Sequence, residues 1–402
     1  MKRVALVVTI LFALLAFGIG FAGTTVALDV SRPVVADSHA TVRFVVNEGD
    51  TTTDVANNLA KAGLIRNALV FRLLARYKHL DTSIQHGIYD LSPGMTMDQI
   101  VAKLQTAIPD EQLVTVPPGM RITQYPAYFT ELPNFNADNF LKIAQTGILL
   151  DDAKTPISSK YWFVPKKGTN VKYALEGYLF PDTYYFDKKA DETKVIETML
   201  TNLGEHLCPG PDNKPDAYLA DKAQCTAHAA QVGNTDIFSA MKKAYGAKDE
   251  TDALHTALIF ASLTVREIVK IGDAQGVTNV YYTRYMALTG KTANTGDVSS
   301  MGADPTAQYA LESENPPKDG KWWKPLQAAG SAVATTDPYN TNVTSNGNLP
   351  PGPIAAPLWD EIKAAANPSI WKYFYFVNDC HGNTLYATTN AENTANFNKP
   401  CS

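Results

Sequence analysis

The order of apolar and polar residues gives the 402-residue chain a long uncharged start and a mixed remainder. After Lys2 and Arg3, Val4–Leu28 is a run of 25 residues without a charge, rich in Val, Leu, Ala and Phe. A run of this length can cross a bilayer, and basic residues in front of it favour a cytoplasmic N-terminus. We therefore expect a retained membrane anchor over residues 1–30, with a cleaved signal peptide as the alternative. In both cases the bulk of the chain is exported.

A compact module is predicted for residues 41–110, after a polar linker over residues 31–40. Short apolar runs indicate strands, and apolar positions spaced three or four apart indicate helices. Gly63 ends the first of these helices, and a Pro93-Gly94 turn follows the second strand. The predicted strands are Val42–Val46 and His86–Leu91, and the predicted helices are Thr53–Ala62, Leu69–Tyr77 and Met97–Leu104.

Residues 111–402 are predicted to form one larger domain of mixed α and β structure. The aromatic run Trp371–Val377 is typical of a strand in the middle of a sheet. Polar segments at about 207–235 and 313–336 are predicted insertions, and in the second we expect Trp322 and Trp323 to pack rather than to bind a ligand. The fold class is therefore α+β, and the clearest helices of this part are Ala137–Gly147 and Glu192–His206.

One apolar stretch of this domain, Ala253–Val269, carries a carboxylate close to its end. If the stretch is a helix, Thr256, Phe260, Leu263 and Glu267 lie on one stripe. Apolar neighbours disfavour the charged form of an acid, so we expect the pKa of Glu267 to be raised. A carboxyl that is neutral near pH 7 can donate a proton, as acid catalysts of glycosidic cleavage do. The alternative is an ordinary glutamate on the rim of the core.

Composition and charge narrow the class of protein. Charged residues make up 19% of the chain and aromatic residues 10%, which is typical of a globular protein and not of a disordered one. The net charge of −5 gives no sign of a polyanion-binding surface. We therefore do not expect nucleic acid as a partner.

The four cysteines agree with export. They allow three pairings, of which the nearest-neighbour one, Cys208 with Cys225 and Cys380 with Cys401, is the simplest. Disulfides persist in oxidising compartments. No two cysteines have the close spacing of a zinc or redox site, and the seven histidines are scattered. We expect neither a metal nor another cofactor.

Several segments, taken in chain order, resemble the YceG-like (MltG) family of membrane-anchored endolytic murein transglycosylases. The most specific are the runs LEGYLFPDTY and LPPGPI, which begin at Leu175 and Leu349. The resemblance extends from the N-terminal run to about Asn393. Its segments are Gly87–Tyr89 with Pro93–Thr96, Leu175–Tyr184, Ala261–Leu263 through Glu267, Asp304–Thr306, Pro338–Thr341, Leu349–Ile354 and Tyr373–Val377.

The resemblance implies a transmembrane helix, a LysM-like module and a YceG-like catalytic domain on the extracytoplasmic side of the cell membrane. The domain would cleave glycan strands of peptidoglycan, and peptidoglycan synthases are candidate partners. The family's catalytic Glu ends an ASIVEKE-type motif, which falls without gaps on Ala261–Glu267. The module over residues 41–110 would bind glycan, or would act as a spacer that sets the height of the active site above the membrane.

The chain departs from the family pattern at several positions. Val265 and Arg266 stand where the motif has Glu and Lys. Thr283-Arg284-Tyr285 replaces the family's Asn-Arg-Leu triplet, and Gly302 replaces a Gln two residues before Asp304. Asn383 and Glu392 stand in place of a C-terminal His pair. Glu267 is unaffected by these changes.

Four further residues are candidates for substrate binding. Glu176 is expected to orient the sugar or to bind backbone amides around the Phe180-Pro181-Asp182 turn, with a simple packed turn as the alternative. Asp304 precedes Pro305, which favours an extended segment beside the cleft. Tyr339 and Asn340 offer an aromatic face and an amide for sugar recognition, with a simple turn as the alternative.

Three hypotheses about function follow. The leading one is a lytic transglycosylase in which Glu267 alone serves as acid and then as base, leaving 1,6-anhydromuramyl ends. The second is a glycan hydrolase, which needs a second carboxylate beside Glu267, from Glu176 or Asp304. The third is a scaffold that binds glycan strands and recruits synthases without cutting.

Overall fold

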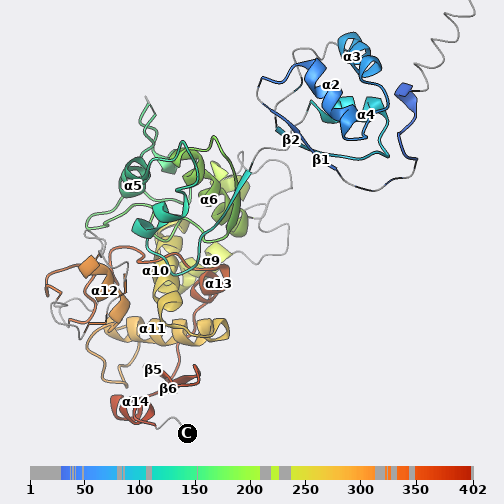
Figure 1. Ribbon diagram of the computed structural model, residues 1–402. Helices are drawn as coiled ribbons and strands as arrows, with labels where there is room; N and C mark the ends of the chain where they lie inside the picture. The colour runs from blue at the N-terminus through green and yellow to red at the C-terminus, as the bar shows by residue number, and fades with distance from the viewer. Residues whose placement is uncertain are drawn as a thin grey trace, which may run out of the picture. The chain divides into compact units, whose positions relative to one another are not determined.

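The chain forms two compact units, of which one ends at Glu111 and the other begins at Gln112. Each is described by itself (Figure 1). The computed structural model describes residues 29–36, 38, 40, 42–47, 49–78, 84, 87–105, 111–151, 153–208, 219–225, 237–312, 322–323, 325–326, 333–343 and 349–399.

The first unit is a two-stranded sheet covered by three helices. β1 (Val42–Val46) pairs antiparallel with β2 (Gly87–Leu91), so that Val42 lies opposite Leu91. Buried residues of both strands and all helices form one hydrophobic cluster. All five predicted elements are confirmed, with ends that differ by one residue where the structure describes them. The helices are α2 (Thr52–Lys61), α3 (Ala68–Tyr77) and α4 (Met97–Lys103).

Local capping explains why the helices of this unit begin where they do. At the start of α2, the Thr51 hydroxyl accepts the Asp54 N–H, and the Asp54 carboxylate accepts the Thr51 N–H. Thr96 and Gln99 form the same reciprocal pair at the start of α4. Such capping boxes satisfy backbone donors that the first turn of a helix leaves open.

The second unit is built around one long helix, α10 (Glu250–Glu267). Its N-cap is Asp249, whose carboxylate accepts the Asp252 N–H at 2.9 Å. Side chains on every side of its middle turns are buried, because α9, α11 and α13 all contact it (Figure 1). The described helices of this unit are η2 (Ile122–Tyr128), α5 (Ala137–Thr146), η3 (Ile157–Ser159), α6 (Glu192–Leu207), α9 (Ile237–Tyr245), α10, η4 (Ile271–Asp273), α11 (Ala274–Leu288), α12 (Asp304–Glu312), α13 (Trp359–Ala366) and α14 (Asn390–Phe397).

The strands of the second unit form two small sheets. β3 (Glu111–Thr115) pairs with β4 (Thr183–Asp187), and β5 (Tyr375–Asn378) pairs antiparallel with β6 (Thr384–Ala387). The prediction of a central strand over Trp371–Val377 is therefore wrong. The strand starts later, pairs with β6 in a two-stranded sheet, and is contacted by the helices α11 and α14.

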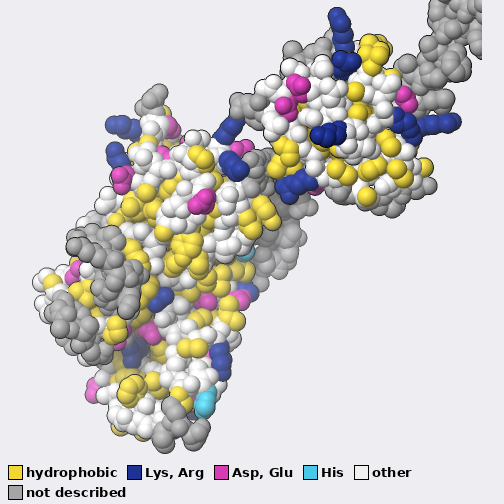
Figure 2. Space-filling model, in the orientation of Figure 1, with side chains coloured by type: hydrophobic (Ala, Val, Ile, Leu, Met, Phe, Trp, Pro, Cys, Tyr) yellow, Lys and Arg dark blue, Asp and Glu magenta, His cyan; other side chains and the backbone are white. Residues whose placement is uncertain are grey.

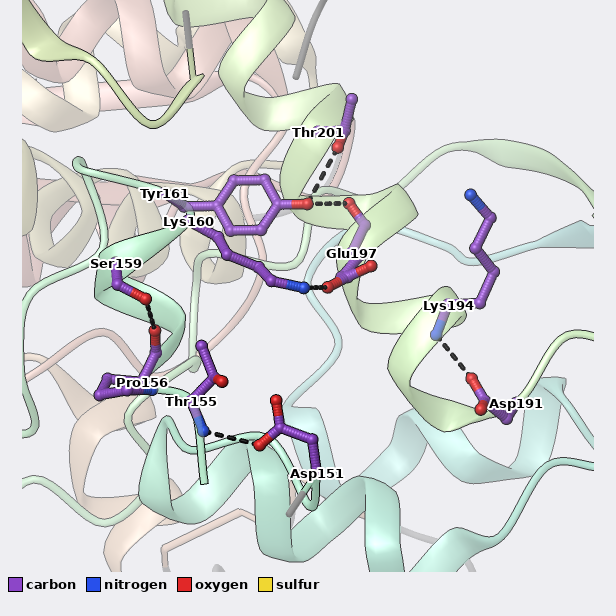
Figure 3. Close-up of polar contacts among 10 residues, drawn as sticks. All are labelled: Asp151, Thr155, Pro156, Ser159, Lys160, Tyr161, Asp191, Lys194, Glu197 and Thr201. Atoms are coloured by element: carbon purple, nitrogen blue, oxygen red, sulfur yellow. Dashed lines mark hydrogen bonds and ion pairs between the residues drawn. The ribbon is translucent and has the colours of Figure 1, made fainter. Parts of the chain in front are cut away.

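A loop before α6 shows how irregular segments are attached to this helical core. Tyr161 donates its hydroxyl proton to the Glu197 carbonyl at 3.0 Å, and the Lys160 ammonium lies 2.6 Å from the Glu197 carboxylate (Figure 3). In the same loop the Asp151 carboxylate accepts the Thr155 N–H at 2.7 Å. The loop is therefore tied to α6 by side-chain contacts.

The cysteine and anchor predictions have different outcomes. Cys208 and Cys225 are joined by a disulfide, as the nearest-neighbour pairing predicts. Cys401 lies outside the described residues, and so does Val4–Leu28, the predicted anchor. Among the residues that the structure does describe, no helix has both the length and the apolar character needed to span a bilayer.

Candidate active site

Glu267 is the last residue of α10, at the point where this helix leaves the core. On the predicted stripe, Phe260 and Leu263 are fully buried, and Glu267 is half-buried. Burial raises the pKa of the Glu267 carboxyl above its ordinary value, in the predicted direction. The C-terminal end of a helix carries a partial negative charge, which also disfavours a carboxylate at this place.

Two side chains from later in the chain hold Glu267. The Tyr281 hydroxyl, on α11, donates to Glu267 Oε1 at 2.9 Å, and Tyr281 is itself only 1% exposed. The Asn378 amide, at the end of β5, donates to the Glu267 backbone carbonyl at 2.9 Å. No described residue donates a hydrogen bond to Oε2 of Glu267, so the Tyr281 hydroxyl engages one of the two carboxyl oxygens and not the other.

Charged groups act on Glu267 in opposite directions. After burial, the charge of Asp304 also raises the pKa of Glu267, whereas the Tyr281 hydrogen bond, Arg266 and Arg284 lower it. Arg284 belongs to α11, and its side chain is held by a hydrogen bond from Nη1 to the Met301 carbonyl at 2.7 Å. The carboxyl therefore lies between one anionic and two cationic side chains, with burial as the dominant effect.

Arg266 lies beside Glu267 in the chain and is part of a cluster of two arginines and one tryptophan. The Arg266 guanidinium lies 4.0 Å from the centre of a Trp323 ring. The Arg121 guanidinium lies 4.2 Å from a ring centre of the same indole. Arg266 Nη1 also donates to the Gly119 carbonyl at 3.2 Å. Trp323 packs against the core, as expected, and what it contacts there is this pair of cations.

The two most specific motifs of the chain meet on α10. The Nε2–H of His255 donates to the Pro351 carbonyl at 3.0 Å, which leaves Nδ1 to accept the Tyr178 hydroxyl at 2.9 Å. Burial lowers the pKa of His255, which keeps the ring neutral in this role. Gly177 has φ +78°, and a Cβ there would lie 2.5 Å from Pro353. His255 therefore joins both motifs to α10, and the contact with Pro353 explains the glycine at position 177.

Glu176 is almost fully buried, at 2% exposure, and its carboxyl forms hydrogen bonds inside the domain. Its carboxyl accepts the Ile122 N–H at 3.0 Å and the Tyr309 hydroxyl at 3.0 Å. Burial raises the pKa of Glu176 to about 8, although both hydrogen bonds and the charge of Arg121 act in the opposite direction. The amides that it binds are those of Ile122, at the start of η2, and of Gly177, and not those of the predicted Phe180-Pro181-Asp182 turn.

Removing the Tyr281 hydroxyl is expected to change the pH dependence of the glycan cleavage that the sequence predicts. In Tyr281→Phe, Glu267 loses a hydrogen bond that lowers its pKa, so its pKa rises further. If Glu267 acts as the acid, the alkaline fall of kcat/KM moves to higher pH, and the rate falls about tenfold for a hydrogen bond worth ~1.5 kcal/mol. Tyr285→Phe, on the same helix, is the matched control. An unchanged profile in Tyr281→Phe would show that the contact does not tune the acid.

The chain matches the model of one known protein family. The model of the YceG-like family matches residues 44–399, which is most of the chain. The chain belongs to the YceG-like family.

Named relatives of this YceG-like chain are similar over most of its length. It is 25% identical over 397 residues to the endolytic murein transglycosylase of Streptococcus pneumoniae strain D39, an alignment that covers 95% of this chain and 62% of that protein. The chain thus spans less than two thirds of the pneumococcal relative. The endolytic murein transglycosylase of Bacillus subtilis is 26% identical over 365 residues, or 89% of this chain and 84% of that protein.

A solved structure also resembles the YceG-like chain. The crystal structure of a yceG-like protein from Listeria monocytogenes matches with a TM-score of 0.48 and 23% identity. The match covers 89% of this chain and 99% of that one.

Among the other residues predicted for the site, Asp304 is the one whose charge raises the pKa of Glu267. It is exposed, its charge acts on Glu267, and its Oδ1 accepts the Asn342 amide at 2.9 Å. The expectation of an extended segment is wrong, because Asp304 is the first residue of α12. Pro305 is tolerated there because the first turn of a helix needs no N–H donor at that position.

Tyr339 and Asn340 are placed mainly in internal contacts. Tyr339 is fully buried, with its ring 4.9 Å from that of Tyr309, and its hydroxyl accepts the Lys172 N–H. Asn340 is 6% exposed, donates to the Ala334 carbonyl and accepts the Asn342 N–H. Sugar recognition by these two residues and by Glu176 stays a prediction.

The departures from the family pattern have local explanations. Gly302 has φ +61°, and a Cβ there would lie 2.9 Å from Arg284 Nη1. Thr283 is buried and accepts the Trp371 N–H at 2.8 Å. Asn383 accepts a hydrogen bond from Lys270, and Glu392 caps α14. None of these contacts involves the carboxyl of Glu267.

Two residues of the site were not found from the sequence. Tyr281 follows Glu267 by 14 positions, on the next helix, and no motif marks it. Asn378 lies 111 positions away from Glu267, one residue past the aromatic run. The signal that could have found Tyr281 is the crossing of two neighbouring helices, which periodicity alone does not define.

Proposed function

We propose that this protein is an endolytic murein transglycosylase that uses Glu267 as its single acid and base. The observation that carries the proposal is the half-buried Glu267 carboxyl, whose pKa is raised and whose Oε1 is held by Tyr281. The names of the pneumococcal and Bacillus relatives support the reaction class. The substrate would be the glycan strands of peptidoglycan.

In the proposed reaction the protonated Glu267 gives its proton to the glycosidic oxygen between MurNAc and GlcNAc. The C1–O4 bond breaks, and GlcNAc leaves with the new hydroxyl. The ionised Glu267 then takes the proton of the muramyl 6-hydroxyl, whose oxygen bonds to C1 and closes the 1,6-anhydro ring. Glu267 ends the cycle protonated, and no water is consumed. A group in a desolvated site suits both steps, because burial favours its protonated form and makes it a stronger base once it is ionised.

Arg266 and Arg284 would stabilise Glu267 in its ionised form. Both cations lower the pKa of Glu267, and neither forms a close ion pair with it in the described residues. They therefore stabilise the carboxylate between the two steps without holding it so firmly that it could not accept a proton.

The products of the reaction test this proposal. The full chain, kept in detergent, is incubated with purified sacculi, and the released fragments are analysed by mass spectrometry. We expect 1,6-anhydromuramyl ends, which are lighter by one water than reducing ends. Reducing ends would instead support the hydrolase hypothesis, for which Asp304 is the second carboxylate whose charge acts on Glu267. Binding to sacculi without any product would support the scaffold hypothesis.

The membrane topology is a further part of the proposal. The uncharged run Val4–Leu28 would anchor the chain and place both units on the extracytoplasmic side. The first unit would be a LysM-like module, because its strands and first two helices follow in the order β1, α2, α3, β2. Peptidoglycan synthases remain candidate partners.

A further inference from the structure

Helix α3 of the first unit exposes three large apolar side chains in one line. Leu69, Leu73 and Tyr77 are 55%, 55% and 81% exposed, and their spacing of four residues puts them on one stripe. Figure 2 shows hydrophobic side chains gathered at the surface over this helix. The opposite side of α3 packs in the hydrophobic core, where Val70, Phe71 and Ala75 are buried. A contiguous apolar patch of this kind marks an interaction surface.

Basic side chains lie along one edge of this stripe. At about 100° per residue, Arg72 and Arg76 fall directly beside Leu69 on the helical wheel. The helix has no acidic residue anywhere in its sequence, ALVFRLLARY. The outward face of α3 therefore presents two leucines, one tyrosine and the exposed Arg76, with the half-buried Arg72 beside them. This is the composition of a helix that lies in a membrane interface.

The start of α3 lies against the segment that follows the uncharged N-terminal run. Arg66, two residues before α3, donates from Nη1 to the Arg32 carbonyl at 2.9 Å and from Nη2 to the Val34 carbonyl at 3.1 Å, with a further bond to the Pro33 carbonyl. Arg32 is only four residues beyond Leu28, the end of the run. The exposed face is thus attached to the part of the chain nearest to the proposed anchor.

We propose that this face of α3, made by Leu69, Arg72, Leu73, Arg76 and Tyr77, docks on an anionic lipid surface. The apolar side chains would enter the boundary between headgroups and acyl chains, and the two guanidiniums would contact lipid phosphates. A helix of ten residues binds weakly by itself, but a tether a few residues away raises its effective concentration at the membrane. Docking would hold the first unit in one orientation on the bilayer.

Lipid fits this surface better than the other polymers near it. A glycan strand offers hydroxyl and amide groups, for which leucine side chains have no hydrogen-bonding atoms. The absence of acidic side chains on α3 matches a surface of negative charge. The inference concerns the first unit and does not depend on the reaction proposed for Glu267.

Fluorescence quenching by brominated lipid tests the docking. The full chain carrying Leu73→Trp is reconstituted into vesicles of phosphatidylglycerol and phosphatidylcholine in equal parts, with bromine on the acyl chains. All five native tryptophans lie beyond residue 111, so the wild type gives the background. We expect the emission added by Leu73→Trp to be lost in these vesicles. Asn57→Trp, at an exposed polar position of the neighbouring α2, should keep its added emission.

Charge is tested in the same assay. Adding Arg72→Gln and Arg76→Gln to Leu73→Trp, or using vesicles of phosphatidylcholine alone, should restore the emission. Equal emission from the position 73 and position 57 variants in anionic vesicles would overturn the proposal. So would quenching that is the same in neutral vesicles, or a response that appears only when glycan strands or another protein is added. Hydrogen exchange of α3 in the wild type, slower with anionic than with neutral vesicles, gives a second measurement that needs no substitution.

Discussion

Glu267→Gln is expected to lower the rate of strand cleavage by a factor of about 10²–10⁴, the usual contribution of general acid–base catalysis. Glutamine has nearly the shape of glutamate and keeps an oxygen for the Tyr281 hydroxyl, but it can neither give a proton to the glycosidic oxygen nor take one from the 6-hydroxyl. Because both steps would pass through one residue, no other carboxyl can take over half of the reaction. The measurement is the amount of 1,6-anhydromuramyl ends released from sacculi over time.

Two controls separate chemistry from folding in this experiment. Glu205→Gln makes the same change at an exposed position of α6 and should leave the rate unchanged. Thermal unfolding of Glu267→Gln should match that of the wild type, since glutamine keeps the shape of the side chain and the acceptor for the Tyr281 hydroxyl. If Glu267→Gln kept more than about a tenth of the wild-type rate, a difference of less than ~1.4 kcal/mol in the barrier, Glu267 would not be the acid.

Changes at Glu176 are expected to have their largest effect on stability. Glu176→Ala leaves the Ile122 N–H and the Tyr309 hydroxyl without their acceptor inside the domain. Each lost partner costs ~1–3 kcal/mol, so the free energy of unfolding should fall by about 2–6 kcal/mol. Glu176→Gln keeps an acceptor oxygen and should cost much less at neutral pH. Urea unfolding of the two variants and the wild type measures these differences.

The same residue gives the stability of the wild type a pH dependence. The pKa of Glu176 rises from 4.5 to about 8 on folding. Between these values the unfolded chain has lost the proton and the folded chain still holds it, so stability falls as pH rises, by up to ~1.4 kcal/mol per pH unit. Glu176→Gln has no proton to lose there and should remove this slope. Equal slopes for the two proteins from pH 5 to pH 8 would show that Glu176 stays ionised in the folded state.

What could be predicted from the sequence was local. The strands and helices of the first unit were found because caps, Gly63 and short apolar runs act within a few residues. The helix that ends at Glu267 was predicted because an apolar stretch that ends in an acid is visible in one segment of the chain. The direction of its pKa shift followed from burial alone.

What could not be predicted depends on contacts between distant segments. The partners of Glu267 come from α11 and β5, and their approach is set by how helices cross, not by spacing in the sequence. The sequence suggested that Glu176 could bind the sugar, but whether it faces a cleft or the interior is decided by η2 and Tyr309. Trp371–Val377 was expected in mid-sheet because aromatic residues suit any buried surface, and α11 supplies that surface here.

The contact between Glu267 and Asn378 has a consequence for the biosynthesis of the protein. The helix that carries the acid is complete by residue 267, but the amide that receives its last carbonyl, and Phe376 that packs 5.6 Å from Tyr281, come more than a hundred residues later. If Glu267 is the acid of the proposed reaction, its local arrangement cannot form in a growing chain before residue 378 has been synthesised.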